Sequence, residues 1–179
     1  LVFEDPDFRS TLETAFLLAE VELNAEENNL PYSSAEIPTT AFKTKLPEHL
    51  RDTVNLCRVF ILLKGCKMET PEIHRNSIQR LASYTGQGMI HSAESNGAPP
   101  NYKSYPLAEY ANPNASNPKE IWDVVPMNTW HYPEASCEND WRTVTFHSVC
   151  SATIVDEYTT AYSKDEIYTP PKTKPTEVD

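Results

Sequence analysis

The first part of the chain carries a hydrophobic pattern with the period of an α-helix. Asp5 is a favourable N-cap, and the proline that follows it suits the first helical position. Leu17, Leu18 and Val21 widen the apolar face and predict that the helix is well buried. The Asn-Asn-Leu-Pro segment at 28–31 predicts its end. The residues that define the apolar face are Phe8, Leu12, Phe16, Ala19 and Leu23.

Two further helices are expected before residue 90. Residues 48–64 place apolar side chains at helical spacing and end at Gly65. A shorter helix followed by a buried strand at 59–63 is the alternative, because short apolar runs do not distinguish the two. A third helix begins at the Thr-Pro-Glu of 70–72 and ends near residues 86–88. His74 lies on its apolar side, which is typical of a half-buried structural histidine.

The second half of the chain differs from the first in its composition and in its hydrophobic pattern. Residues 89–119 are rich in Pro, Asn and Tyr and predict a long irregular loop. Residues 143–154 alternate with the period of a β-strand, with Val144 and Phe146 on one face and Thr143, Thr145 and His147 on the other. Further short strands are expected between residues 121 and 169.

These patterns predict an α+β fold in which an N-terminal layer of about three helices packs on a C-terminal antiparallel β-sheet. The expected organisation is a single domain over residues 1–169, followed by a Pro-rich tail at 170–179. Within the domain, residues 1–88 are mainly helical, 89–119 form the loop, and 120–169 are mainly strands.

The charge balance excludes some classes of partner. The 179 residues include 15 Lys and Arg against 26 Asp and Glu, which gives a net charge of −11. Nucleic acids and anionic membranes require a cationic surface, so we expect neither as a partner. The longest apolar run, at 59–63, is too short for a membrane-spanning helix.

The chain has four cysteines, and an even number predicts two disulfides in an oxidising compartment. Three pairings are open. A bridge between Cys57 and Cys66 requires the second helix to break between them, whereas Cys137 and Cys150 meet no such obstacle. The cysteines therefore predict a disulfide-stabilised, secreted or extracytoplasmic protein.

The densest group of reactive side chains lies at 131–157. A zinc site built from His131, Cys137, His147 and Cys150 is not favoured, because strand alternation places His147 and Cys150 on opposite faces. We therefore expect no metal and no cofactor. If the protein is an enzyme, the sequence favours a small secreted hydrolase, although no hydrolase motif is present and an enzyme is the less favoured class. Its candidate acid–base residues are His131, His147, Asp140 and Glu157, with Asp156 as a further carboxylate.

Tyrosine and tryptophan concentrate after residue 100, and such residues are enriched at recognition surfaces. The sequence therefore predicts an extracytoplasmic structural or protein-interaction domain that contacts other protein subunits within a surface or multi-subunit assembly. A glycan-binding module is a further alternative. The expected contact residues are Tyr102, Tyr105, Tyr110, Trp130, Tyr158 and Tyr162.

Overall fold

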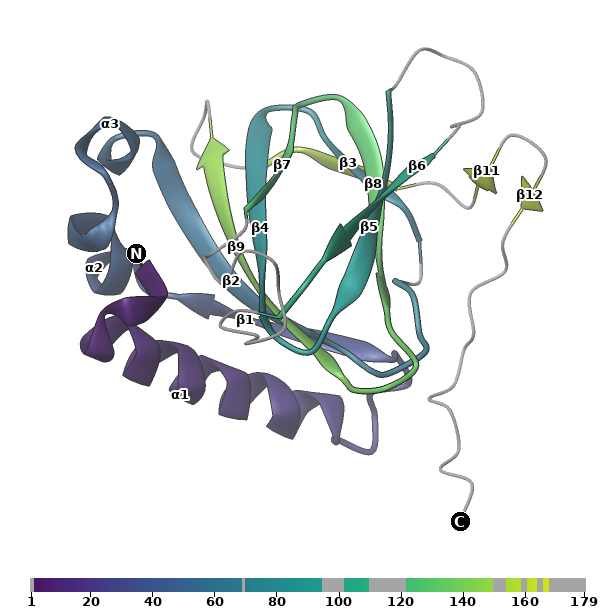
Figure 1. Ribbon diagram of the computed structural model, residues 1–179, viewed down its shortest axis with the longest axis horizontal. Helices are drawn as coiled ribbons and strands as arrows, with labels where there is room; N and C mark the ends of the chain where they lie inside the picture. The colour runs from purple at the N-terminus through teal and green to yellow at the C-terminus, as the bar shows by residue number, and fades with distance from the viewer. Residues whose placement is uncertain are drawn as a thin grey trace.

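Two antiparallel five-stranded sheets that face each other dominate the fold (Figure 1). The computed structural model describes residues 2–68, 70–94, 102–109, 122–149, 154–158, 161–163 and 166–167. The first sheet has the order β1 (Tyr32–Ile37), β2 (Val54–Leu62), β9 (Trp141–Val149), β4 (Ser77–Thr85) and β7 (Asp123–Val125). The second has the order β10 (Asp156–Tyr158), β3 (Glu72–His74), β8 (Thr129–Ala135), β5 (Gly88–Glu94) and β6 (Lys103–Leu107). A small hairpin pairs β11 (Ala161–Ser163) with β12 (Glu166–Ile167).

Helices cover the outer face of the first sheet (Figure 1). The long helix α1 (Pro6–Leu23) packs on β1 and β2. The shorter helical segments are Val2–Glu4, α2 (Thr39–Phe42), Lys43–Lys45 and α3 (Glu48–Arg51). Within the described part of the chain, no helix has both the length and the apolar character needed to cross a membrane.

The prediction for α1 is confirmed in its position and its buried face. Asp5 caps the helix, and its Oδ1 accepts a hydrogen bond from the backbone N–H of Phe8 at 2.9 Å. The five residues that define the apolar face are all buried. The expected burial of Leu17, Leu18 and Val21 is wrong, because these side chains are 62%, 62% and 73% exposed. The sheet covers only one side of the helix, and these residues point away from it.

The predicted helices at 48–64 and 70–86 are wrong, because most of these residues form β2, β3 and β4. In β2, Cys57 and Val59 pack toward α1, whereas Leu62 packs toward the second sheet. Both faces of the strand are therefore buried, and the sequence has no polar alternation to distinguish it from a buried helix. The α+β class with a helical layer of three helices is corrected to a mainly β fold.

The region expected to be a loop, 89–119, contains β5 and β6 in its described parts. The alternation predicted for residues 143–149 is confirmed in β9. Val144 and Phe146 pack against α1, and His147 faces the second sheet together with Thr143 and Thr145. The single domain over 1–169 stays a prediction, and the tail at 170–179 lies outside the described residues.

The expected disulfides are not formed among the described residues. Cys57, Cys66 and Cys137 are free thiols, and Cys150 lies outside the described part of the chain. Cys57 is buried in the core under α1, and this burial raises the pKa of its thiol well above the usual value. Without these disulfides, the class of disulfide-stabilised secreted structural proteins loses its main support.

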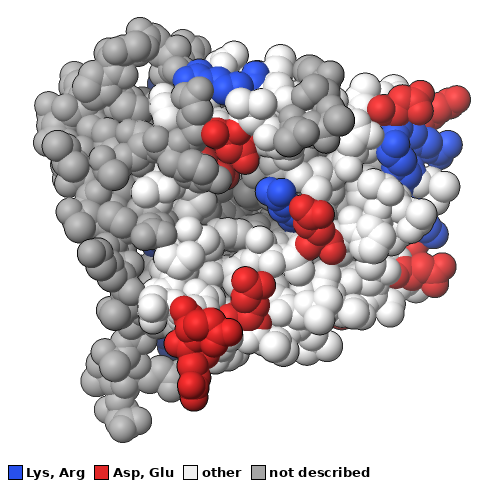
Figure 2. Space-filling view, turned by 180° about the vertical axis from the view of Figure 1, so that it is seen from behind, with Lys and Arg blue, Asp and Glu red and all other residues white. Residues whose placement is uncertain are grey.

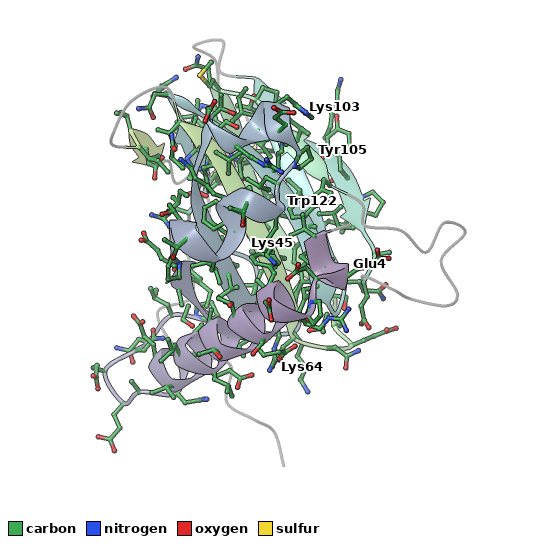
Figure 3. All side chains as sticks on the ribbon, turned by 90° about the vertical axis from the view of Figure 1, so that its left-hand side faces the viewer. Glu4, Lys45, Lys64, Lys103, Tyr105 and Trp122 are labelled. Carbon is green, nitrogen blue, oxygen red and sulfur yellow. The ribbon has the colours of Figure 1, made fainter. Side chains whose placement is uncertain are left out.

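Ion pairs join the acidic N-terminal region to basic residues further along the chain. Lys45 Nζ lies 2.7 Å from Asp5 Oδ2, and this pair holds α1 against the segment before α3 (Figure 3). Arg142 pairs with Glu20 near the other end of α1. On the face shown in Figure 2, acidic and basic side chains lie next to each other at several places.

Candidate metal centre

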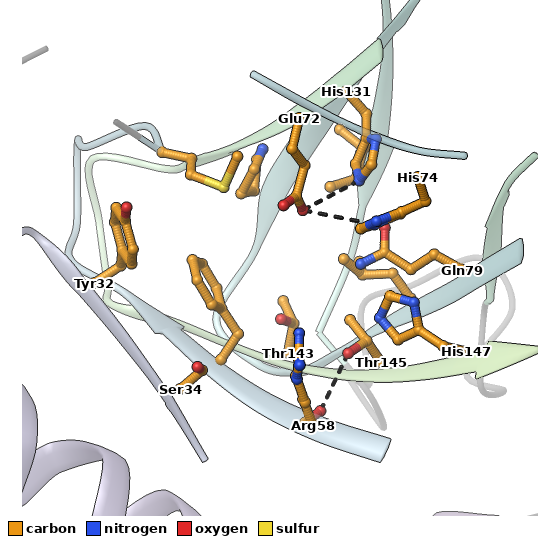
Figure 4. A pocket seen from close by; sticks show the side chains of 15 residues that line it. Tyr32, Ser34, Arg58, Glu72, His74, Gln79, His131, Thr143, Thr145 and His147 are labelled. Carbon is orange, nitrogen blue, oxygen red and sulfur yellow. Dashed lines mark hydrogen bonds and ion pairs between the residues drawn. The ribbon is translucent and has the colours of Figure 1, made fainter. Parts of the chain in front are cut away.

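A cavity of about 190 Å³ lies between the two sheets (Figure 4). At about 15 Å³ for each water-sized molecule, it has room for roughly ten of them, which is the scale of a small metabolite. Phe60, Leu81 and Ile90 form apolar parts of its wall. The polar side chains at its inner end are Glu72, His74, Gln79, His131, Thr143 and His147.

The register of the second sheet brings three of these side chains together. Glu72 and His74 flank Ile73 on β3, so the alternation of the strand directs both to the cavity while Ile73 packs on the other side. His131 on β8 lies directly opposite Glu72 across the antiparallel pair. Asn128, at the turn before β8, donates its backbone N–H to the carbonyl oxygen of His74 at 2.9 Å and ties the two strands together.

The distances within this cluster suit a shared ion. One ligand atom from each of Glu72, His74 and His131 lies within 4.8 Å of the other two. Glu72 Oε1 is 3.4 Å from His131 Nε2 and 3.7 Å from His74 Nε2. Atoms that bind one metal at about 2.0–2.2 Å lie roughly 3.0–3.5 Å apart. The two measured spacings therefore come within a few tenths of an ångström of those in a metal site.

The outer nitrogens of both histidines are already engaged. His74 Nδ1 lies 2.6 Å from Asp156 Oδ1, and the register pairs these residues directly across β3 and β10. His131 Nδ1 lies 3.1 Å from the carbonyl oxygen of Thr129. A carbonyl oxygen and an ionised carboxylate only accept hydrogen bonds, so each Nδ1 carries the proton. In the neutral imidazole, the lone pair then lies on Nε2, which faces Glu72.

Both Nε2 atoms are buried and have no hydrogen-bond partner among the described residues. A buried polar atom without a partner costs free energy, and an atom left in this state often serves a ligand. Protonated imidazoles paired with Glu72 are the alternative. In that arrangement both Nε2–H groups would have to donate to the same Glu72 oxygen, from 3.4 and 3.7 Å, which is long for charge-assisted hydrogen bonds. A metal ion fits the donor set better.

The charges in the cavity favour an ionised carboxylate and a neutral His147. Burial raises the pKa of Glu72, but the contact with His131 and the coulombic effect of the histidines, which acts only while a positive charge lies beside the carboxylate, lower the pKa to about 2. Burial, His74 and Arg58 lower the pKa of His147 to about 3. At neutral pH, Glu72 is therefore a carboxylate and His147 carries no charge.

Two imidazole nitrogens and one carboxylate oxygen are donors used for zinc and for redox-active first-row transition metals. Soft thiolate ligands are not part of the cluster, and neither Cys66 nor Cys137 lines the cavity. Asp156 and the Thr129 carbonyl orient the two imidazoles from outside, as is usual for metal-binding histidines. Glu72, His74 and His131 thus form a candidate metal centre.

The structure brings together part of the predicted acid–base set. His131 and His147 both line the cavity. Asp140 is exposed at the start of β9, outside the cavity lining, and its Oδ1 accepts the backbone N–H of Lys64 at 2.9 Å. The side chain of Glu157 lies outside the described part of the chain. A catalytic role for these residues stays a prediction.

The predicted aromatic contact residues lie away from the cavity. Tyr102 is half-buried, its ring lies 5.0 Å from that of Tyr132, and burial raises its pKa. Tyr105 is 44% exposed on the edge strand β6, where it points outward (Figure 3). Trp130 is half-buried on β8. The side chains of Tyr110, Tyr158 and Tyr162 lie outside the described residues. A binding surface made by this set stays a prediction.

Sequence reasoning missed Glu72 and assigned His74 a structural role. The predicted helix at 70–86 concealed the relevant signal, which is the alternation of Glu72, Ile73 and His74. Read as a strand, this triplet directs a carboxylate and an imidazole to the same face. Asp156 was weighed only as a partner for a hydrolytic histidine, whereas its carboxylate orients His74.

The two facing antiparallel sheets give the chain the fold of its structural neighbours, which are cupin-fold proteins. A structure of oxalate oxidase aligns with 74% of this chain at a TM-score of 0.51 and 12% identity. The chain spans 58% of the length of that oxalate oxidase. At this level of identity the likeness shows the fold alone.

Two other solved structures are similar with lower TM-scores. Vicilin from hazelnut, Corylus avellana, gives a TM-score of 0.49 at 14% identity over 75% of this chain and 32% of its own. A predicted oxalate decarboxylase from Thermotoga maritima gives 0.43 at 14% identity over 66% of this chain and 80% of its own. No protein-family model matches the chain, and no curated protein sequence matches it.

These findings correct the functional expectation. An extracytoplasmic structural or protein-interaction domain gains no support from a cupin fold with an inner His/Glu cluster. The alternatives of a secreted hydrolase and a glycan-binding module belong to the same expectation and are corrected with it.

Proposed function

We propose that this protein binds one divalent transition-metal ion through Glu72, His74 and His131 and acts on a small molecule held in the same cavity. The observation that carries this proposal is the pair of buried Nε2 atoms without a hydrogen-bond partner, both facing an ionised carboxylate. The cavity volume supports a small substrate in place of a polymer.

The residues of the chain have separable roles in this proposal. Glu72 supplies a negative charge, and the two imidazoles supply neutral donors. Asp156 and the Thr129 carbonyl hold the protons on the Nδ1 atoms, so that each Nε2 keeps its lone pair. His147 stays neutral beside the centre and adds no repulsive charge. A bound transition metal would supply Lewis-acid or redox chemistry at this point.

Metal titration tests the proposal directly. Protein treated with a chelator and then dialysed is titrated with Co²⁺ or Mn²⁺, and binding is followed by calorimetry and by the visible absorption of Co²⁺. We expect one ion per chain. In the variant Glu72→Gln, the loss of the charged donor should weaken binding by more than about 100-fold.

Glu134→Gln is the matched control, because Glu134 also contacts a histidine but lies outside the cavity lining. We expect it to bind the metal like the unmodified protein. A protein that binds no metal would contradict the proposal, and a protein that binds it equally well after Glu72→Gln would show that Glu72 is not a ligand.

The cavity does not test the other predictions made from the sequence. Contacts with further protein subunits, the exclusion of nucleic acid, a possible glycan contact and an extracytoplasmic location stay predictions. None of them is needed for the metal centre.

A further inference from the structure

A positively charged side chain lines the same cavity from the opposite sheet. Arg58 lies on β2, and in Figure 4 its guanidinium points from the strand toward Glu72. The hydroxyl of Thr145 on the neighbouring strand donates to the carbonyl oxygen of Arg58 at 3.4 Å. The cavity therefore has a carboxylate with two imidazoles at one end and a guanidinium on the facing wall.

Most of the hydrogen-bonding capacity of Arg58 is unused by the described residues. Its acidic contact there is Glu36, whose Oε1 lies 3.3 Å from Nη2. The two side chains are 37% and 65% exposed, so this pair adds little to stability. A guanidinium has five N–H donors in a planar fork, which matches the two oxygens of a carboxylate.

Thr143 adds a second polar group beside Arg58. Its hydroxyl is buried and has no hydrogen-bond partner among the described residues, and on β9 it lies two residues from Thr145, the partner of Arg58 in the strand register. The Gln79 side-chain oxygen in the same cavity is also buried and without a partner there. A buried hydroxyl without a partner beside a guanidinium can donate to the same anion.

The charge balance of the cavity favours an anion. A divalent ion together with ionised Glu72 leaves one positive charge, and Arg58 adds a second. An uncharged ligand would leave these charges without a counter-ion in a site that is partly shielded from water. The apolar wall formed by Phe60 and Leu81 suits the carbon part of such an anion.

We propose that the cavity binds a small organic acid, with its carboxylate held by Arg58 and Thr143 and its other end directed to the Glu72–His74–His131 centre. This proposal rests on the metal centre proposed above. Room for roughly ten water-sized molecules limits the ligand to about the size of a four-carbon diacid.

The test measures binding of succinate to Mn²⁺-loaded protein by calorimetry, with the uncharged analogue succinamide and inorganic phosphate as comparisons. We expect succinate to bind, and succinamide and phosphate to bind at least about tenfold more weakly. Arg58→Gln should weaken succinate binding by about 10- to 100-fold while the affinity for Mn²⁺ stays the same.

Further variants separate recognition from a general structural effect. Glu36→Gln releases Arg58 from its surface partner and should tighten succinate binding about two- to fivefold. Thr143→Val keeps the shape of the side chain and should weaken binding a few-fold. Arg51→Gln is the control, because Arg51 is exposed and donates to the Leu46 carbonyl away from the cavity. It should leave succinate binding unchanged.

The outcomes distinguish this proposal from the one on which it rests. Protein that binds Mn²⁺ but not succinate overturns the organic-acid site and leaves the metal centre standing. Succinate binding that survives Arg58→Gln also overturns it, as does phosphate binding as tight as that of succinate. Protein that binds no Mn²⁺ overturns both proposals.

Discussion

Two groups of histidines in this protein differ in how their ring nitrogens are used. On the outer face of the second sheet, His91 has both nitrogens engaged, with Ser104 Oγ at 2.8 Å and Glu134 Oε2 at 2.7 Å. Inside the cavity, His74 and His131 have engaged Nδ1 atoms, but their buried Nε2 atoms lack a hydrogen-bond partner among the described residues.

The difference shows which histidines are available to a ligand. His91 stacks on Tyr132 with ring centroids 4.5 Å apart, and its hydrogen bonds account for its burial without any further group. His74 and His131 are buried at least as deeply, but in the part of the chain that the structure describes neither Nε2 atom has a hydrogen bond. Burial alone therefore does not distinguish the two kinds of histidine, and the proposed metal centre rests on the buried Nε2 atoms beside a carboxylate.

The largest expected effect comes from removing a cavity imidazole. His74→Ala or His131→Ala should weaken metal binding by more than about 100-fold, because each removes a direct donor. His91→Ala should leave the metal affinity unchanged. Calorimetric titration of the three variants with Co²⁺ measures the contrast, and an equal loss in all three would mean that the substitutions act through folding.

A smaller effect is expected from the residue that orients His74. Asp156→Asn keeps the size of the side chain but removes the charged acceptor of the Nδ1 proton, and it should weaken metal binding by about 10- to 100-fold. Metal titration measures this loss. Asp140→Asn is the matched control, because Asp140 is an exposed carboxylate outside the cavity lining. An Asp156→Asn protein that binds metal normally would show that the Asp156 contact does not set the tautomer of His74.

The third expected effect concerns pH and His147. Burial, His74 and Arg58 lower its pKa from the usual 6.5 to about 3 in the folded state. The unfolded chain therefore binds the proton first as pH falls, and the stability from neutral His147 is lost between about pH 6.5 and 3. Urea unfolding of the metal-free protein at several pH values measures this loss. We expect the free energy of unfolding to change with pH by up to about 1.4 kcal/mol per pH unit.

His147→Gln should flatten that slope, because it removes the titrating group. His49→Gln is the control, since His49 is exposed and should leave the slope unchanged. A slope that is the same in all three proteins would place the pH dependence in other groups of the cavity.

The smallest expected effect separates stability from binding. His91→Ala removes two hydrogen bonds and a ring contact from the outer face of the second sheet, and should lower the free energy of unfolding by about 1–2 kcal/mol. Chemical denaturation measures this loss. The partly exposed Glu134 regains water, so the cost stays modest. A loss of metal binding in this variant would contradict the separation of the two histidine groups.

Part of the fold could be predicted from the sequence, where one face of an element meets the core and the other meets water. The buried face of α1, its cap at Asp5 and the alternation of β9 are such cases. The strands β2 and β4 could not be predicted in this way. Much of both their faces is buried, which removes the alternation that identifies a strand.

The candidate site, too, could be predicted only in part from the sequence. His131 and His147 could be chosen from the sequence as reactive side chains near carboxylates, but the partners expected for them were neighbours in sequence. The partner that matters for His131 is Glu72, which is 59 positions away and becomes adjacent only through the pairing of β3 with β8.

The amino-acid sequence by itself determined the amphipathic helix α1 and the faces of β9, because these depend on local spacing. Only the tertiary structure decided that the chain forms two facing sheets and that Glu72, His74, Asp156 and His131 meet. The physical reason is that strand register joins residues far apart in the chain. A one-residue shift in that register would direct the same side chains to the opposite face.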